Sequence, residues 1–184
     1  ESGALWLDPN LTSAYEVYQY FLNASDADVP NYLKSLTLLP IEEIESLIEK
    51  SVKNPELREA QKALAAEVVL LVHGQDAFDQ ALKVSKALFS GDFSDINEKG
   101  FQMLTRTLES VTIQKDQGLL DLLIESNLAS SKREGRTFIQ SGAISLNNSK
   151  ATDTEYIITK DDTMFNSYII LRRGKKKYAM ILYK

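Results

Sequence analysis

The sequence predicts an α+β protein, with an N-terminal all-α domain followed by a smaller α+β domain. Apolar residues recur at helical spacing through the first part of the chain, whereas short alternating runs dominate the end. Charge changes at the same place: residues 1–116 carry 10 basic and 19 acidic side chains, and residues 117–184 carry 11 and 7. We therefore expect a helical domain at residues 1–109, a linker at 110–117 and an α+β domain at 118–184.

The first two helices are predicted by their capping residues. Ser13 stands three residues before Glu16, which is a capping box, and an apolar stripe follows it. Short polar residues at positions 23–28 interrupt this stripe and favour a turn. Asp28 is placed to cap a second helix that has Pro30 in its first turn.

Four further helices complete the predicted helical domain. Pro40 opens the third helix, and the Asn54-Pro55 pair opens the fourth. Gly74 is a natural stop for that fourth helix. A fifth helix is expected at about residues 75–89 and a shorter one at about residues 96–108.

Two short helices and a small sheet are predicted for the second domain. A leucine-rich helix begins at Leu119 and ends near Asn127. Ser131 and Glu134 form another capping box, and their helix stops at Gly142. Four β segments are then expected, at residues 143–146, 156–159, 168–172 and 178–183.

Two basic clusters distinguish this second domain. The last thirteen residues hold six cations and no acid, although the whole chain has a net charge of −5. The other cluster lies in the first turns of the capped helix, where unpaired backbone N–H groups also favour phosphate. Rigid clusters of this kind favour a phosphate backbone, and a solvated hairpin without a partner is the alternative. The candidate binding residues are Lys132, Arg133, Arg136, Arg172, Arg173, Lys175, Lys176 and Lys177.

Several classes of site are excluded or disfavoured. The chain has no cysteine, which excludes disulfides, thiolate metal sites and cysteine catalysis. The apolar run Val68–Val72 is far too short to span a membrane. No Walker loop is present, because Gly174 lacks an upstream glycine at the required spacing. His73 is expected to pack beside a helix stop, so we expect no catalytic residue. Asp26 and Asp28 alone would lack the remaining oxygen ligands of a metal ion, so we expect no metal site.

A set of ordered segments carries a resemblance to a known family. They read ESGALWLD at residues 1–8, TSAYEVYQYF at 12–21, DADV at 26–29, LVHG at 71–74, ALFSG at 87–91 and LRRGKKKY at 171–178. Together they cover essentially the whole chain, which resembles the C-terminal part of bacterial tyrosyl-tRNA synthetases. The first segment resembles the stretch directly after the KMSKS-type loop of that family.

The resemblance implies a function and an organisation. The first half is then a helical anticodon-binding domain, and the second is the small RNA-binding fold named after the fourth small-subunit ribosomal protein. The parent would be an ATP-dependent tyrosine–tRNA ligase, a class I synthetase, whose catalytic domain with ATP and Mg lies before Glu1. We expect this chain to be inactive alone and without a cofactor of its own. We also expect it to be cytoplasmic and monomeric, although the parent is a homodimer, and to bind tyrosine tRNA but neither DNA nor membranes.

Asp26 and Asp28 are the candidate anticodon readers, since they lie in the polar break between two helices. Splayed anticodon bases are read along their edges, and the two N–H donors of guanine suit a carboxylate. The alternative is that both aspartates cap the next helix.

Two other functions remain open. A protein-interaction module with an incidental basic tail would suit the acidic helical surface at residues 40–67. A different RNA-binding protein, such as a pseudouridine synthase or a ribosomal protein, could share only the C-terminal fold. The long match over residues 1–91 argues against the second alternative, and the salt dependence of tRNA binding tests the first.

Overall fold

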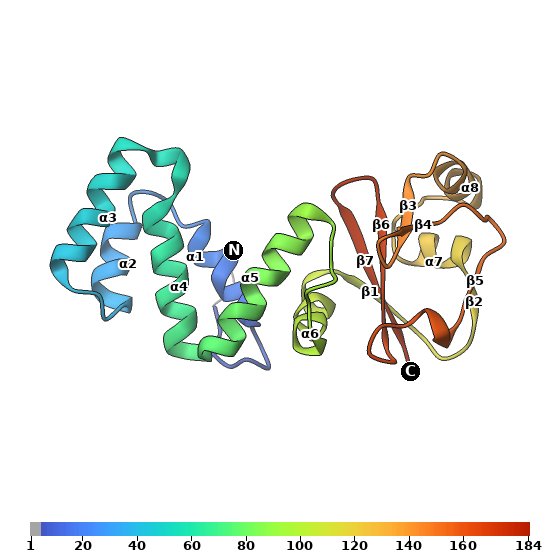
Figure 1. Cartoon of the computed structure of the whole chain (residues 1–184), viewed down its shortest axis with the longest axis horizontal. Coiled ribbons are helices and arrows are strands. Elements are labelled where there is room, and N and C mark those ends of the chain that lie inside the picture. The colour runs from blue at the N-terminus through green and yellow to red at the C-terminus, as the bar shows by residue number, and fades with distance from the viewer. Residues whose placement is uncertain (1–4) are drawn as a thin grey trace. The chain divides into compact units, whose positions relative to one another are not determined.

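The computed structural model describes residues 5–184, which divide into two compact units with a boundary in the sequence between Leu82 and Lys83. Helices α1 to α6 come first, and strands with the two further helices α7 and α8 follow, so the predicted α+β class is confirmed (Figure 1). The first four residues of the segment Glu1–Asp8, on which part of the family resemblance rests, lie outside the described residues.

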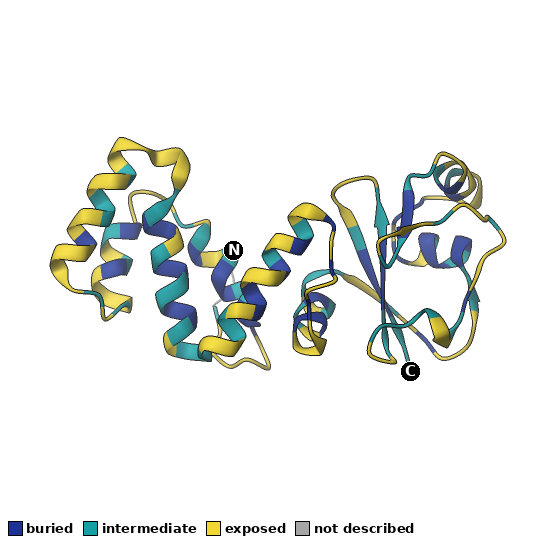
Figure 2. Ribbon diagram, in the orientation of Figure 1, coloured by how far each residue is buried: buried dark blue, intermediate teal, exposed yellow. Residues whose placement is uncertain are grey.

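The first unit is helical, as predicted, and is built around one long helix. Leu64, Ala65 and Val69 of α4 are buried, and α4 packs against α1, α2 and α3. Figure 2 shows the dark buried faces of α1 and α4 inside this unit. The elements are α1 Ala14–Leu22, α2 Val29–Leu36, α3 Ile41–Lys53, the 3₁₀ turn η1 Pro55–Leu57, α4 Glu59–His73 and α5 Gln75–Ser90, the last of which runs into the second unit.

The capping box predicted for α1 is confirmed. The Ser13 hydroxyl accepts a hydrogen bond from the Glu16 backbone N–H at 3.3 Å, and the Glu16 carboxylate accepts the Ser13 N–H at 2.7 Å. Two otherwise unpaired donors at the helix start are thereby satisfied. Because Ser13 is only 5% exposed, this cap also lies within the packed part of the unit.

The fourth predicted helix begins later than its Asn54-Pro55 signal indicates. The structure places the short turn η1 there, and α4 starts only at Glu59. Arg58 separates the two, with a left-handed backbone at φ 51°. Its Nη2 donates to the carbonyl of Ala24 at 3.2 Å. Arg58 and Ala24 are 34 residues apart, so the periodicity of the local sequence could not predict their contact.

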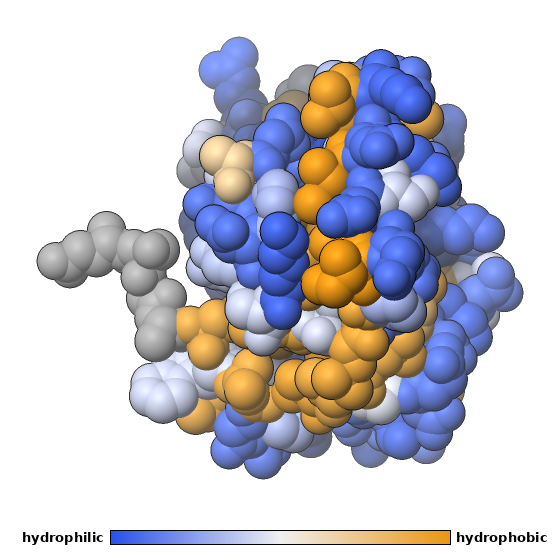
Figure 3. Space-filling view, turned by 90° about the vertical axis from the view of Figure 1, so that its left-hand side faces the viewer, coloured by the Kyte–Doolittle hydropathy of each residue, from blue (hydrophilic) through white to orange (hydrophobic). Residues whose placement is uncertain are grey.

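The first unit also exposes large apolar side chains. Leu38 is 83% exposed and Val52 is 78% exposed. Figure 3 looks onto the end of this unit that lies at the left of Figure 1 and shows apolar side chains gathered beside a hydrophilic surface.

The second unit contains a five-stranded sheet in the order β1-β7-β6-β3-β4. Only the β1–β7 pairing is parallel, and the others are antiparallel. The four predicted β segments are confirmed as β3, β5, β6 and β7, within about one residue at each end. The elements are α6 Glu98–Thr107, β1 Glu109–Ile113, β2 Gln117–Gly118, α7 Leu119–Glu125, α8 Lys132–Gln140, β3 Ile144–Leu146, β4 Ser149–Lys150, β5 Ile157–Ile158, η2 Lys160–Asp162, β6 Tyr168–Arg173 and β7 Lys177–Tyr183; β2 and β5 pair separately.

The segment expected as a linker contributes a strand. Residues 109–113 form β1 at the edge of the sheet, with Glu109 opposite Ala179 and Ile113 opposite Tyr183. Ile113 is buried in the core of the unit. The sequence could not reveal this strand, because its parallel partner lies about seventy residues further along the chain.

Both faces of the sheet are covered. Ile169 and Leu171 face a core that includes the leucines of α7, whereas Ile170 and Met180 are buried on the other face. Phe101 of α6 lies 5.6 Å from Tyr168, ring centre to ring centre, on that second face. The helix predicted at residues 96–108 therefore exists as α6, but it belongs to the same compact unit as the sheet.

Within residues 5–184, every helix is too short or too polar to cross a lipid bilayer.

Candidate nucleic-acid interface

The β6–β7 hairpin presents three lysines at its tip. Gly174 turns the chain with φ 62°, and Lys175, Lys176 and Lys177 are all exposed. None of the described acidic side chains forms an ion pair with them. Paired strands on both sides of the turn hold these charges on a stable base, as the sequence predicts.

Arg172 and Arg173 leave the same strand on opposite faces of the sheet. The Nη1 of Arg172 lies 3.5 Å from the carbonyl oxygen of Gly91. Gly91 has φ 81°, and a side chain there would collide with the Arg172 guanidinium. Both arginines are half-buried, in contrast to the exposed lysines that follow them. The structure therefore separates the predicted cluster into three exposed cations and two that contact protein groups.

The second cationic cluster lies on α8. Lys132, Arg133 and Arg136 are exposed in its first turns, as the sequence predicts. Lys132 also reaches Asp121 of α7, with 2.6 Å between Nζ and Oδ1, in an exposed ion pair of little energetic weight. The helix start thus combines backbone N–H groups with cationic side chains, which suits a phosphate group.

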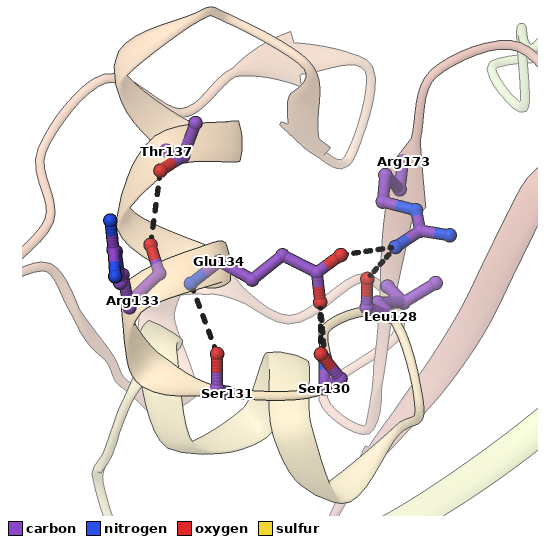
Figure 4. A network of polar contacts seen from close by, with 7 residues as sticks. All are labelled: Leu128, Ser130, Ser131, Arg133, Glu134, Thr137 and Arg173. Atoms are coloured by element: carbon purple, nitrogen blue, oxygen red, sulfur yellow. Dashed lines mark hydrogen bonds and ion pairs between the residues drawn. The ribbon is translucent and has the colours of Figure 1, made fainter.

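The capping box predicted for α8 is only half formed. Ser131 accepts from the Glu134 N–H at 3.2 Å, but the Glu134 carboxylate turns to Ser130 instead of to Ser131 (Figure 4). It accepts both the backbone N–H and the hydroxyl of Ser130 at 2.6 Å. The sequence could not distinguish two adjacent serines as donors, because both lie within reach of the same carboxylate.

Electrostatics connects the two clusters. The pKa of Glu134 lies below its ordinary value, first because Ser130 donates two hydrogen bonds to the carboxylate and then because Arg173 and Lys177 are positively charged neighbours. The geometric link is Arg173 at the base of the hairpin, whose Nη1 lies 3.9 Å from a carboxylate oxygen of Glu134 on α8. The structure brings the hairpin and α8 together as one cationic region of the second unit.

Asp26 and Asp28 occupy different surroundings in the first unit. Asp28 stands at the N-cap position of α2 but makes no side-chain cap, and it accepts instead from the Ser25 hydroxyl at 2.7 Å. Asp26 accepts from the side-chain amide of Gln61 at 2.5 Å. Both aspartates are exposed. The capping alternative is thus wrong for the side chains of both.

A pocket of about 300 Å³ lies beside Asp26. Its walls are largely apolar and come from α2, α3, η1 and α4: Val29, Pro30, Ile48, Val52, Pro55 and Ala60. Gln61 also lines it and is 1% exposed. The sequence reasoning missed Gln61, although a signal was present: Gln61 is the one polar member of the helical stripe that continues through Leu64 and Val68.

Comparisons with known proteins cover the two parts of the chain in turn. Residues 1–90 match the family of class I tRNA synthetases (W and Y), and residues 100–181 match the tyrosine–tRNA ligase SYY-like C-terminal domain. Tyrosine–tRNA ligase 1 of Bacillus licheniformis is 45% identical over 186 residues, which is 100% of this chain and 44% of that protein. The tyrosine–tRNA ligase of Onion yellows phytoplasma is 42% identical, over 100% of this chain and 45% of its own length.

The chain also aligns in part with solved structures. The solution structure of a tyrosyl-tRNA synthetase C-terminal domain is 33% identical and aligns over 53% of this chain and 100% of its own, with a TM-score of 0.42. A C-terminally truncated mitochondrial tyrosyl-tRNA synthetase of Aspergillus nidulans is 44% identical over 47% of this chain, with a TM-score of 0.44. The chain spans less than half the length of the curated relatives that it matches.

Proposed function

We propose that the chain is a tRNA-binding part of a tyrosine–tRNA ligase, because its two parts match, in order, the class I tRNA synthetases (W and Y) and the tyrosine–tRNA ligase SYY-like C-terminal domain. The observation that carries the proposal is the cationic region of the second unit. In a chain of net charge −5, α8 and the β6–β7 hairpin gather exposed cations with few acidic partners. That arrangement favours an extended polyanion such as the backbone of a tRNA.

The two units take different roles in this proposal. Lys132, Arg133 and Arg136 on α8, together with the hairpin lysines, bind backbone phosphates and supply most of the affinity. Asp26, at the mouth of an apolar pocket, reads the edge of an anticodon base. Asp28 is the second candidate for this role, because its carboxylate is also exposed and makes no helix cap.

The full-length protein is, in this proposal, an ATP-dependent tyrosine–tRNA ligase of the cytoplasm that acts as a homodimer. ATP and Mg would bind in the part of the relatives that this chain does not cover. The chain alone would then be monomeric and would form no tyrosyl-adenylate. Purified chain should show no tyrosine-dependent exchange between pyrophosphate and ATP above background, and it should sediment as a monomer. Exchange above background, or a tight dimer, would contradict this part of the proposal.

Salt dependence tests the binding role itself. We expect the logarithm of the affinity for a tyrosine tRNA transcript to fall steeply and linearly with the logarithm of the salt concentration, by about 0.7–0.9 per phosphate contacted. A DNA duplex of equal charge, measured in the same series, should bind more weakly, because it offers no splayed anticodon bases to Asp26. Weak binding that is nearly insensitive to salt would favour the protein-interaction alternative.

A further inference from the structure

Arg173 differs from the exposed lysines and arginines of the cationic region because its charge is directed into the protein. Its Nη1 donates to the carbonyl of Leu128 at 2.7 Å and lies 3.9 Å from a carboxylate oxygen of Glu134. Its guanidinium carbon lies 4.7 Å from the centre of the Phe138 ring. Only 20% of the side chain is exposed. Figure 4 shows Arg173 aimed at the loop before α8, with Arg133 pointing away on the other side of the helix.

The three contacts fix one element to another. Leu128 belongs to the loop between α7 and α8 and is itself 3% exposed, while Glu134 and Phe138 lie in successive turns of α8. Arg173 is the last residue of β6, where it pairs with Lys177 of β7. A single guanidinium therefore ties the base of the lysine hairpin to the start of α8.

The chemistry of arginine suits this task. A planar guanidinium can stack on an aromatic ring with its face while its edge donates hydrogen bonds in fixed directions. A lysine ammonium is a compact point charge and cannot make both contacts with the same geometry. Replacing Arg173 by lysine would keep the net charge but loosen the connection between the two elements.

The two cationic clusters need that connection, because phosphates along an RNA backbone have a set spacing. We propose that Arg173 is a positioning residue: it holds α8 and the β6–β7 hairpin at the separation at which both clusters bind one RNA backbone, and it makes no phosphate contact itself. This inference rests on the proposed tRNA-binding function. In this proposal the exposed lysines and arginines bind phosphate, whereas Arg173, which carries the same charge, only positions them.

The test compares variants of the full chain by the salt slope of tyrosine tRNA binding. Arg173→Lys should lower the slope by more than one unit although the charge is unchanged, since a misplaced cluster loses several phosphates at about 0.7–0.9 each. Arg173→Met should lower it by a similar amount. Lys176→Met, which removes one phosphate contact without moving α8, should lower it by less than one unit.

Phe138→Leu provides an independent variant that touches no charge. It removes the ring under Arg173 and should reproduce much of the slope loss of Arg173→Lys, which keeps the test valid if the arginine variants do not fold. Ile139→Val is the matched structural control, because Ile139 is buried in the same helix. It should lower the melting temperature and leave the slope unchanged.

Three outcomes would overturn the inference. The first is a wild-type slope in Arg173→Lys with a loss of about one unit in Arg173→Met, which indicates a direct phosphate contact. The second is an unchanged slope in Phe138→Leu. The third is an equal slope loss in Ile139→Val at an equal drop in melting temperature, which indicates general destabilisation. A salt-insensitive wild type would instead refute the proposed function, so the two failures are distinguishable.

Discussion

The hydrogen bond between buried Gln61 and exposed Asp26 gives Asp26 a structural role in the first unit. Gln61 is almost completely buried, yet its amide nitrogen has a partner in the exposed carboxylate of Asp26. A buried amide without such a partner costs free energy, so Asp26 stabilises the helical unit even if it also reads a base. Asp26 therefore has a structural role beside the base-reading role proposed for it, whereas the Asp28 carboxylate accepts from the hydroxyl of the neighbouring Ser25.

Asp26→Ala separates these roles when it is compared with Asp28→Ala. We expect Asp26→Ala to lower the free energy of unfolding by about 1–3 kcal/mol, because it leaves the Gln61 amide unpaired. It should also relax discrimination among anticodon-variant tRNAs at one position by roughly 1–3 kcal/mol, a magnitude taken from base-edge contacts in duplexes. Asp28→Ala should change stability by less. Unchanged preference among the variants would leave Asp26 with a structural role and move base reading to Asp28 or elsewhere.

His73 predicts a pH dependence of stability. Burial lowers its pKa below the ordinary value of 6.5, and its Nε2 is buried without a hydrogen-bond partner in the structure. The unfolded chain therefore binds a proton more readily than the folded chain does. The stability due to neutral His73 is present above pH 6.5 and is lost as the pH falls below it. Urea unfolding of wild type and His73→Gln at pH 7.5 and 5.5 tests this: the wild type should lose more stability on acidification, and equal losses would contradict it.

Two elements of the second unit, α8 and the β6–β7 hairpin, present the exposed cationic side chains of the cationic region. The exposed lysines at the tip of the β6–β7 hairpin and the cations on α8 each depend on the element that presents them. Hydrogen bonds among Ser130, Ser131 and Glu134 hold the start of α8 in place. The backbone N–H groups and the cationic side chains of this first turn therefore have defined positions. Phosphate contacts of this kind set position and affinity but do not read sequence.

Neutralising the lysines of the β6–β7 hairpin tests whether this element binds phosphates. The triple variant of Lys175, Lys176 and Lys177 to glutamine should weaken binding to all tRNAs alike and lower the salt slope by up to about three units, since each lost phosphate contact contributes just under one. The hairpin itself should stay folded, because none of the described acidic groups forms an ion pair with these lysines. Circular dichroism serves as the control. A loss of affinity confined to tyrosine tRNA, with an unchanged slope, would show that these lysines have another function.

At the scale of the whole chain, the boundary between the two compact units does not coincide with the change in charge. The boundary lies between Leu82 and Lys83, whereas the charge balance changes after residue 116. The boundary between Leu82 and Lys83 leaves α6 and β1 with the sheet, where Phe93, Phe101 and Leu104 are buried within the same unit as Ile170 and Met180. The sheet needs a cover on both faces, because its central strands carry apolar side chains on both.

Truncation tests that organisation. A fragment of residues 83–184 should unfold cooperatively, whereas a fragment of residues 118–184 should lose several kcal/mol of stability, because one sheet face is uncovered and each exposed large apolar side chain costs about 1.5–3 kcal/mol. The loss is comparable to the total stability of a small domain. Urea unfolding followed by circular dichroism, with binding of a hydrophobic dye, distinguishes the two fragments. Equal stability would show that the segment from Lys83 to Gln117 does not cover the sheet.

Much of this protein is predictable from local sequence alone. The caps at Ser13 and Ser131, the helical stripes and the alternation in β6 and β7 involve residues at most four positions apart, and they predicted the α+β class correctly. Three contacts were beyond such reasoning: Asp26 with Gln61, Arg173 with Leu128 and Arg172 with Gly91 join residues 35, 45 and 81 positions apart. Local propensity contains no information on which distant group fills a given space. Tertiary packing therefore decided three features. Pairing with β7 makes residues 109–113 a strand, and α6 packs on a face of the sheet. The adjacent Arg172 and Arg173 bind different partners, Gly91 and Leu128.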